Sequence, residues 1–205
     1  MSERLVYVVD DDKAIRASLE ALIPLLHACS IVEFGSGEDF ISKAGSLEPG
    51  CLLLDLCMPV TSGLDVLRFT QGMPGQFVPV MMSGRGEIAD AVTAMKMGAF
   101  DFITKDRQFQ NLAPVLDRAF EHLETTGSVL RAKDKAGSLL KTLSQREREV
   151  LNALIDGQGN KGIAHRLNIS PRTVEVHRAK MMEKLGARNL QEALRIAFAG
   201  GMIVS

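Results

Sequence analysis

Five short runs of apolar residues recur through the first 122 residues, and stretches with helical spacing separate them. Each run is short enough to be a strand buried on both faces, as in parallel sheets. Strands that alternate with helices indicate repeated βα units. The sequence therefore predicts a doubly wound α/β domain around a five-stranded parallel sheet, with strands at Leu5–Val9, Ser30–Phe34, Cys51–Leu54, Val78–Met82 and Phe100–Ile103.

Apolar residues at three- and four-residue spacing predict the helices of this domain. Ser36, Ser62 and Glu87 stand close to three of the expected starts. A side-chain oxygen at such a start accepts hydrogen bonds from the free backbone N–H groups of the first turn. The helices are expected near residues 13–27, 36–45, 63–72, 87–98 and 109–124.

The rest of the chain has a different pattern. Residues 125–141 are rich in Thr, Gly, Ser and Lys, and we expect a partly helical linker at 123–141. Apolar positions continue into it at alternating four- and three-residue steps, which favours a coiled-coil-like connector, although Gly127 opposes a helix by about 1 kcal/mol relative to alanine. Residues 142–205 read as an all-α domain of four helices, at Ser144–Ile155, Asn160–Leu167, Pro171–Leu185 and Leu190–Phe198.

Charge is distributed unevenly along the chain, although its net value is only -1. Residues 1–122 hold 10 basic against 17 acidic residues, and residues 142–205 hold 10 basic against 6 acidic ones. An acidic first domain favours a cation site, and a basic second domain favours a polyanionic partner.

With 46% hydrophobic and 24% charged residues, the composition excludes a disordered or fibrous chain.

No apolar run approaches the roughly 18 residues of a membrane span, and the chain opens on charged Glu3 and Arg4 rather than on a secretory signal. We therefore expect a soluble cytoplasmic protein with no membrane partner.

The three cysteines lack any CxxC spacing, which argues against a disulfide framework and against a zinc site. Cys29, Cys51 and Cys57 are expected to be small buried hydrophobic residues.

Polar residues follow four of the predicted strands, and the carboxyl ends of parallel strands meet at one edge of the sheet. Several carboxylates in one crevice favour a divalent cation, and oxygen ligands suit Mg²⁺. Beside such a cation a carboxylate can attack a phosphoryl donor while a lysine neutralises the phosphoryl oxygens. Asp55 is then a plausible nucleophile, and Ser83 could hydrogen-bond the new phosphate. The full set comprises Asp10, Asp11, Asp12, Asp55, Ser83 and Lys105.

Each of these residues has a plainer interpretation when taken alone. An acidic run after a strand most often caps a helix, and Asp12 is expected to do so. Asp55, Ser83 and Lys105 would each more often be a turn residue, a cap or a solvated side chain. Their joint placement after successive strands favours a common site.

Residues 1 to about 122 resemble the receiver domain of bacterial two-component response regulators, which has a flavodoxin-like fold, and the whole chain resembles the FixJ/NarL subfamily. The resemblance implies that Asp55 is the phosphoacceptor and that Asp10 and Asp11 form an acidic pair. It also implies that Asp11, Asp55 and the backbone carbonyl of Cys57 hold Mg²⁺. The matching stretches are Val8–Asp12, Leu54–Pro59, Ser62–Gly63, Ser83–Gly84 and Met97–Lys105.

By the same resemblance Ser83 and Phe102 form a switch pair, and Lys105 binds the phosphate. In that family the hydroxyl turns toward the phosphate, and the aromatic ring moves into the vacated space. Phe102 has a rival interpretation as an ordinary core residue. Cys57 has a rival interpretation as a redox sensor beside the phosphorylation site.

The segment from Ile163 to Val174 reads as a helix, a short turn and a second helix that Ser170 caps and Pro171 begins. This is a helix-turn-helix pattern. Basic side chains on and before the second helix can contact DNA phosphates. They are Lys161, Arg172, Arg178 and Lys180.

Short stretches around this pattern carry a second resemblance: Leu143–Ser144, Arg146–Glu147, Glu149–Leu151, Asn160–Lys161, Ile163–Ala164, Thr173–Glu175, His177–Arg178 and Lys184–Gly186. Through them the chain resembles the LuxR-type DNA-binding domain from residue 142 to about 199. The resemblance implies that Pro171–Leu185 is the recognition helix and that Leu190–Phe198 contributes a dimerisation surface. It assigns Glu175, Val176 and Ala179 to bases. It assigns Lys161, Thr173, Arg178 and Lys180 to phosphates.

Together these features predict a transcriptional response regulator. Asp55 would accept a phosphoryl group from a cognate sensor histidine kinase, and the protein would then form a homodimer and bind promoter DNA, with RNA polymerase as a further candidate partner. It would catalyse only its own phosphorylation. One alternative is a phosphorylation-independent DNA-binding regulator with a scaffold receiver. The other is a phosphotransferase or phosphatase with an aspartyl intermediate, which needs an acid such as a second Asp where this chain has Cys57.

One position departs from the family pattern. The lysine is normally followed by proline, often through a cis peptide, whereas Lys105 is followed by Asp106. A cis bond before a non-proline residue costs about 2.5 to 4 kcal/mol, so we expect a trans peptide here. Asp106 is also expected to compete with Asp55 for the Lys105 ammonium and so to slow phosphorylation or shorten the life of the phosphate.

Overall fold

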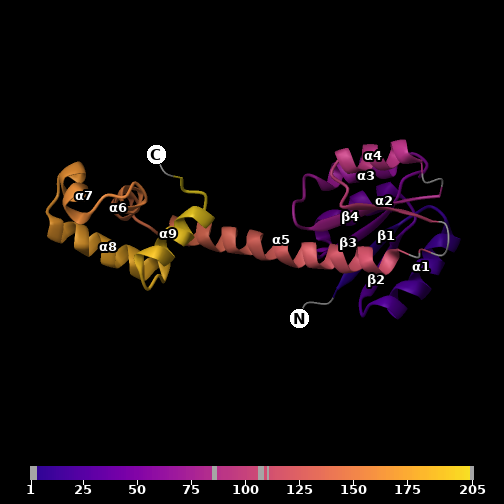
Figure 1. Ribbon diagram of the computed structural model, residues 1–205, viewed down its shortest axis with the longest axis horizontal. Helices are drawn as coiled ribbons and strands as arrows, with labels where there is room; N and C mark the ends of the chain where they lie inside the picture. The colour runs from indigo at the N-terminus through magenta and orange to yellow at the C-terminus, as the bar shows by residue number, and fades with distance from the viewer. Residues whose placement is uncertain (1–3, 85–86, 106–108, 110, 204–205) are drawn as a thin grey trace. The chain divides into compact units, whose positions relative to one another are not determined.

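The computed structural model describes residues 4–84, 87–105, 109 and 111–203. The chain divides into two compact units, Met1–Gly127 and Ser128–Ser205. The division falls inside one helix, α5 (Leu112–Lys141), which is labelled in Figure 1. This helix runs unbroken through residues 123–141, Gly127 included.

The first unit is built on a five-stranded parallel sheet with the order β2-β1-β3-β4-β5. The predicted fold class is confirmed. The central strand β3 is buried along its whole length, as expected for a parallel sheet covered on both faces. The strands are β1 (Leu5–Val9), β2 (Ser30–Phe34), β3 (Gly50–Asp55), β4 (Phe77–Ser83) and β5 (Asp101–Thr104).

Helices cover both faces of this sheet (Figure 1). Side chains alternate along each strand, so Val6 and Val8 of β1 pack with α1 (Lys13–Leu26) and the start of α5. Tyr7 and Val9 point to the opposite face. That face is covered by α2 (Gly37–Lys43), α3 (Gly63–Thr70) and α4 (Ile88–Lys96). The helix expected at 36–45 is α2 followed by a 3₁₀ turn, η1 (Ala44–Ser46).

Capping side chains set the starts of three of these helices. Asp12 accepts a hydrogen bond from the backbone N–H of Ala14 and caps α1, as expected. Ser36 caps α2 in the same way, and Ser62 forms a capping box with Asp65 at the start of α3. The loop from β1 to α1 is short, because the capped helix begins at Lys13, directly after Asp10, Asp11 and Asp12.

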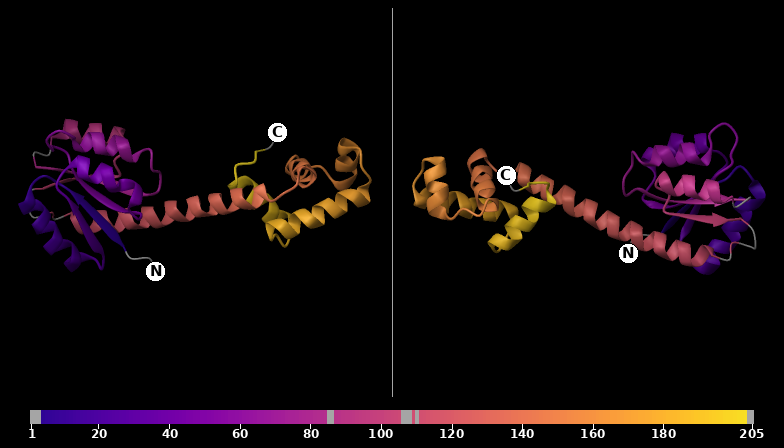
Figure 2. Two further views of the ribbon diagram at one scale, coloured as in Figure 1. Left: turned by 180° about the vertical axis from the view of Figure 1, so that it is seen from behind. Right: turned by 45° about the horizontal axis from the view of Figure 1, so that its top comes forward.

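Among its described residues, the second unit contains helices joined by short connections and no strand, and Figure 2 shows its helices in two views. Val150, Ile163, Val174 and Met181 are among the residues that form its core. The C-terminal part of α5 adds Ala136 and Leu140 to the buried residues of this unit. The helices after α5 are α6 (Gln145–Ile155), α7 (Asn160–Leu167), α8 (Pro171–Leu185) and α9 (Leu190–Ala199), which confirms the predicted all-α domain.

Two sequence expectations concern the surface of the chain. Among the residues that the structure describes, no helix combines the length and the apolar character that crossing a membrane requires. Cys51 is buried and Cys29 is partly buried, but Cys57 is exposed. The prediction of three buried cysteines is therefore wrong for Cys57, because this residue stands in the loop after β3 rather than in a strand.

Candidate functional site

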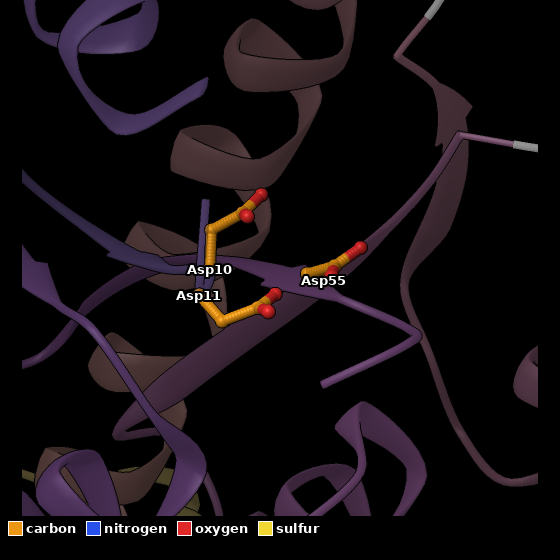
Figure 3. A group of neighbouring side chains, drawn as sticks. All are labelled: Asp10, Asp11 and Asp55. Carbon is orange, nitrogen blue, oxygen red and sulfur yellow. The ribbon is translucent and has the colours of Figure 1, made fainter. Parts of the chain in front are cut away.

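Three carboxylates meet at the carboxyl edge of the sheet. Asp10 and Asp11 follow β1, and Asp55 is the last residue of β3, the neighbouring strand. One carboxylate oxygen from each lies within 4.8 Å of the others. Figure 3 shows the three side chains next to one another. The sheet thus brings together residues that are 45 positions apart, since parallel neighbours end at the same edge.

Lys105, which follows β5, completes the cluster. Its Nζ atom lies 2.7 Å from Oδ1 of Asp55 and 2.8 Å from Oδ2 of Asp10. The lysine side chain is only 12% exposed. Burial lowers the pKa of this ammonium, but hydrogen bonds and attraction to the two carboxylates outweigh burial, so the net pKa is raised. Lys105 therefore stays charged and bridges the two strands.

The cluster has the donor set of a site for a hard cation. Three carboxylates face one ammonium, which leaves excess negative charge. The buried Oδ2 atom of Asp10 has the Lys105 ammonium as its partner at 2.8 Å. Burial raises the pKa of Asp10 and outweighs the hydrogen bonds from Lys105 and Asp12 that lower it. Mg²⁺, which prefers oxygen ligands, fits these residues.

The remaining residues predicted for this site lie around the cluster. Ser83 is the buried last residue of β4, and Phe102 lies in β5, partly buried against the core on the α4 side of the sheet. Cys57 stands two residues after Asp55 with an exposed side chain. The roles given to them stay predictions. The Lys105–Asp106 peptide falls on a residue outside the described part of the chain.

The second unit contains the expected helix-turn-helix. Asn168 ends α7 in the left-handed conformation, with φ of 52°, and its N–H bonds back to carbonyls of α7. Ser170 then caps α8 by accepting a hydrogen bond from the N–H of Thr173, and Pro171 occupies the first turn of the helix. Val174, Met181 and Leu185 form the buried face of α8.

Most of the predicted DNA contacts are exposed on the other faces of α7 and α8. Two are half-buried and already bonded: the Thr173 hydroxyl lies 2.8 Å from that of Ser170, and the Arg178 guanidinium donates to Oδ1 of Asn160 at 3.0 Å. The exposed residues are Lys161, Arg172, Glu175, Val176, Ala179 and Lys180. Their contacts with DNA stay predictions.

Three polar contacts have no signal in the local sequence pattern. They are the bonds from Arg178 to Asn160, from Lys184 to Glu147 and from Arg16 to the backbone carbonyl of Asp10. Two of them join two different helices, and the third joins α1 to the residue that follows β1. Residue spacing predicts only which residues share a face of one element, so these contacts emerge only from the packing of the elements.

The fold and the acidic site agree with the comparisons to known proteins. Residues 6–117 match the response regulator receiver domain, and residues 141–197 match the luxR family of bacterial regulatory proteins. The chain belongs to the two-component response regulators, with a receiver domain and a LuxR-type DNA-binding domain. Within them it is homologous to the FixJ transcriptional regulators. FixJ of Rhizobium meliloti (strain 1021) is 38% identical over 98% of each chain.

One further relative and two solved structures are similar to this chain over nearly its whole length. FixJ of Azorhizobium caulinodans is 36% identical over 96% of this chain and 93% of its own. Among solved structures, response regulator StyR has a TM-score of 0.83 at 30% identity and covers 96% of this chain and 99% of its own. Full-length FixJ from B. japonicum has a TM-score of 0.58 at 34% identity, over 99% and 100%. A receiver joined to a LuxR-type domain is the composition of a regulator rather than an enzyme. The family implies a cognate histidine kinase and promoter DNA as partners.

Proposed function

We propose that Asp55 accepts a phosphoryl group from a cognate sensor histidine kinase and that this controls dimerisation and promoter binding. The observation that carries the proposal is the position of Lys105, whose ammonium contacts both Asp55 and Asp10 at the end of the sheet. Asp55 therefore lies beside both the Lys105 ammonium and the carboxylates of Asp10 and Asp11. A nucleophile for phosphoryl transfer needs this arrangement of charges.

The chemistry follows from the charges of these residues. An oxygen of Asp55 forms a bond to phosphorus while the bond from phosphorus to the kinase histidine nitrogen breaks, and that nitrogen keeps the electron pair. Lys105 neutralises charge on the phosphoryl oxygens. Asp11, Asp55 and the backbone carbonyl of Cys57, with Asp10 beside them, would hold Mg²⁺, which supplies further neutralisation of those oxygens when bound. The transfer is then the protein's own phosphorylation and leaves no released product beyond the free kinase.

The output depends on the charge that phosphorylation adds, about 1.5 to 2 negative charges and three acceptor oxygens. We assign the Ser83 hydroxyl to binding the phosphate. We assign the Phe102 ring to moving into the space that this hydroxyl leaves. The phosphorylated receiver forms a homodimer. Two linked DNA-binding units then bind promoter DNA more tightly than one. RNA polymerase is a further candidate partner.

We divide the chain into a receiver at residues 1–122, a linker at 123–141 and a DNA-binding domain at 142–205, and we place the protein in the cytoplasm. In the DNA-binding domain, Glu175, Val176 and Ala179 face bases. Basic residues of α7 and α8, together with Thr173, face phosphates, and the net positive charge of residues 142–205 supports that assignment. The residues assigned to phosphates are Lys161, Arg172, Thr173, Arg178 and Lys180.

Incubation with acetyl phosphate and Mg²⁺, read by intact mass, tests the proposal. We expect one added phosphoryl group, none on Asp55→Asn, and none in EDTA. A gel shift on promoter fragments should then show tighter binding by the phosphorylated protein. Equal DNA affinity with and without the phosphoryl group would favour the phosphorylation-independent regulator, and labelling of Asp55→Asn would refute Asp55 as the acceptor.

A further inference from the structure

Arg16, in the first turns of α1, contacts the backbone that carries the acidic pair. Its Nη1 atom donates a hydrogen bond of 2.7 Å to the carbonyl oxygen of Asp10. Its Nε atom lies 3.3 Å from Oε2 of Glu33 in β2. The arginine side chain is only 15% exposed. A mostly buried guanidinium that binds both the residue after β1 and a residue of β2 has little freedom to move.

The carbonyl that Arg16 binds belongs to the peptide bond between Asp10 and Asp11. A planar peptide that is held at its oxygen also has its N–H and the next Cα held. The Asp11 side chain starts from that Cα. The carboxylate of Asp10 is held separately, because its Oδ1 atom accepts a hydrogen bond from the N–H of Asp12 at 3.0 Å.

We propose that Arg16 is a positioning residue for the cation site, holding the Asp10–Asp11 peptide so that the Asp11 carboxylate faces Asp55. The inference rests on the proposed function, since it concerns the Mg²⁺ site of that same reaction. Among the described residues, the hydrogen bonds of the Arg16 guanidinium go to the carbonyl of Asp10 and to Glu33 and not to a carboxylate of the cation site. It acts through the backbone, as groups behind a metal's direct ligands do.

Two possible roles of Arg16 predict opposite changes in Mg²⁺ affinity when the residue is replaced. As a positive charge near the cluster, Arg16 repels Mg²⁺, so a purely electrostatic role predicts tighter Mg²⁺ binding by Arg16→Met. As a positioning residue, it orders a ligand in advance, so its loss weakens binding. Groups behind the direct ligands typically change metal affinity by about 10- to 100-fold. We expect about tenfold weaker binding, because only one of the carboxylates is affected.

Calorimetric titration of Mg²⁺ into the full chain separates these roles. The variants are Arg16→Met, Arg16→Lys and Glu33→Gln, with Arg68→Met as the control. Arg68 is an exposed residue of α3 that pairs with Asp65, so its loss changes the net charge equally without touching β1. Thermal unfolding in EDTA shows whether each variant is folded. The amide resonance of Asp11, which belongs to the peptide that Arg16 holds, reports the bond directly.

We expect Arg16→Met to bind Mg²⁺ about tenfold more weakly, Arg16→Lys to recover little of that loss, and Arg68→Met to match the wild type. Glu33→Gln should weaken binding two- to threefold, and it keeps the inference testable if Arg16→Met does not fold. Equal or tighter binding by Arg16→Met, or full recovery by Arg16→Lys, overturns the inference and leaves the proposed function standing. A wild type that binds no Mg²⁺ overturns both.

Discussion

Nζ of Lys184 lies 2.6 Å from Oε2 of Glu147, although the two residues are 37 positions apart. Glu147 also completes the capping box of α6 with Ser144, and its side chain is only 4% exposed. The pair joins the start of α6 to the last turn of α8. The hydrogen bond from Lys184 lowers the pKa of Glu147, burial opposes this, and the bonds from Ser144 lower it further.

We therefore expect Lys184→Met to destabilise the second unit, because it leaves the buried Glu147 carboxylate without its cation. The expected loss is only about 1 kcal/mol, because Lys184 is partly exposed and solvent already screens the pair. Folding lowers the pKa of Glu147. The ionised carboxylate therefore stabilises the folded state above the ordinary pKa of glutamate, and this stabilisation is lost as the pH falls through the pKa of Glu147 in the folded state. Hydrogen exchange of α6 and α8 peptides across this pH range measures it. In Glu147→Gln the pH-dependent part should vanish, and an unchanged pH profile would contradict this account.

Gly63, the first residue of α3, packs directly on the end of β3. A β-carbon at this position would lie 2.1 Å from the carbonyl oxygen of Asp55. Backbone atoms cannot yield as a flexible side chain can, so Gly63→Ala should destabilise the protein by about 3 kcal/mol and slow the labelling of Asp55. Chemical denaturation and intact mass measure the two effects. Gly45→Ala, where a β-carbon meets open space, is the control and should change neither.

Val60, in the loop between β3 and α3, has φ of 64° and is 95% exposed. The N–H of Thr61 bonds to the carbonyl of Pro59 across it at 2.8 Å, which forms a tight turn. A β-branched residue is strained at positive φ, whereas glycine is not. Val60→Gly should raise the free energy of unfolding by about 0.5 to 1 kcal/mol. Val60→Ala retains most of the strain, so a thermal unfolding midpoint for alanine equal to that for glycine would argue against backbone strain.

The two cations of α8 that we assign to DNA phosphates differ in their surroundings. Lys180 is exposed, whereas Arg178 is half-buried and bonded to Asn160. Lys180→Ala should reduce the salt dependence of promoter binding by about one phosphate contact and leave stability unchanged. Arg178→Ala should reduce both the salt dependence of binding and the stability of the domain, since it also breaks a hydrogen bond between α7 and α8. Filter binding over a salt series tests this, with the exposed Lys135→Ala of α5 as the charge-matched control.

The order of the elements was predictable, and so were most of their bounds, because local patterns encode them; α5, expected at 109–124, instead runs from Leu112 to Lys141. A run such as Val78–Met82 between helical stretches has one interpretation, and β4 extends it by a single residue at each end. Ser170 and Pro171 likewise predicted the start of α8 at the correct residue. The convergence of Asp10, Asp11 and Asp55 followed from parallel topology alone, since every strand of such a sheet ends at the same edge.

The sequence by itself determined the two folds, the helix-turn-helix and the residues that could carry chemistry. It did not determine that Cys57 faces solvent, that Val60 takes a left-handed backbone, or that α5 continues through Gly127. Nor did it determine the bond from Arg16 to the carbonyl of Asp10 or the pairing of Glu147 with Lys184. Periodicity and capping act within one element over a few residues, whereas the contacts of Arg16 and Glu147 depend on how separate parts of the chain pack. Only the tertiary structure could decide them.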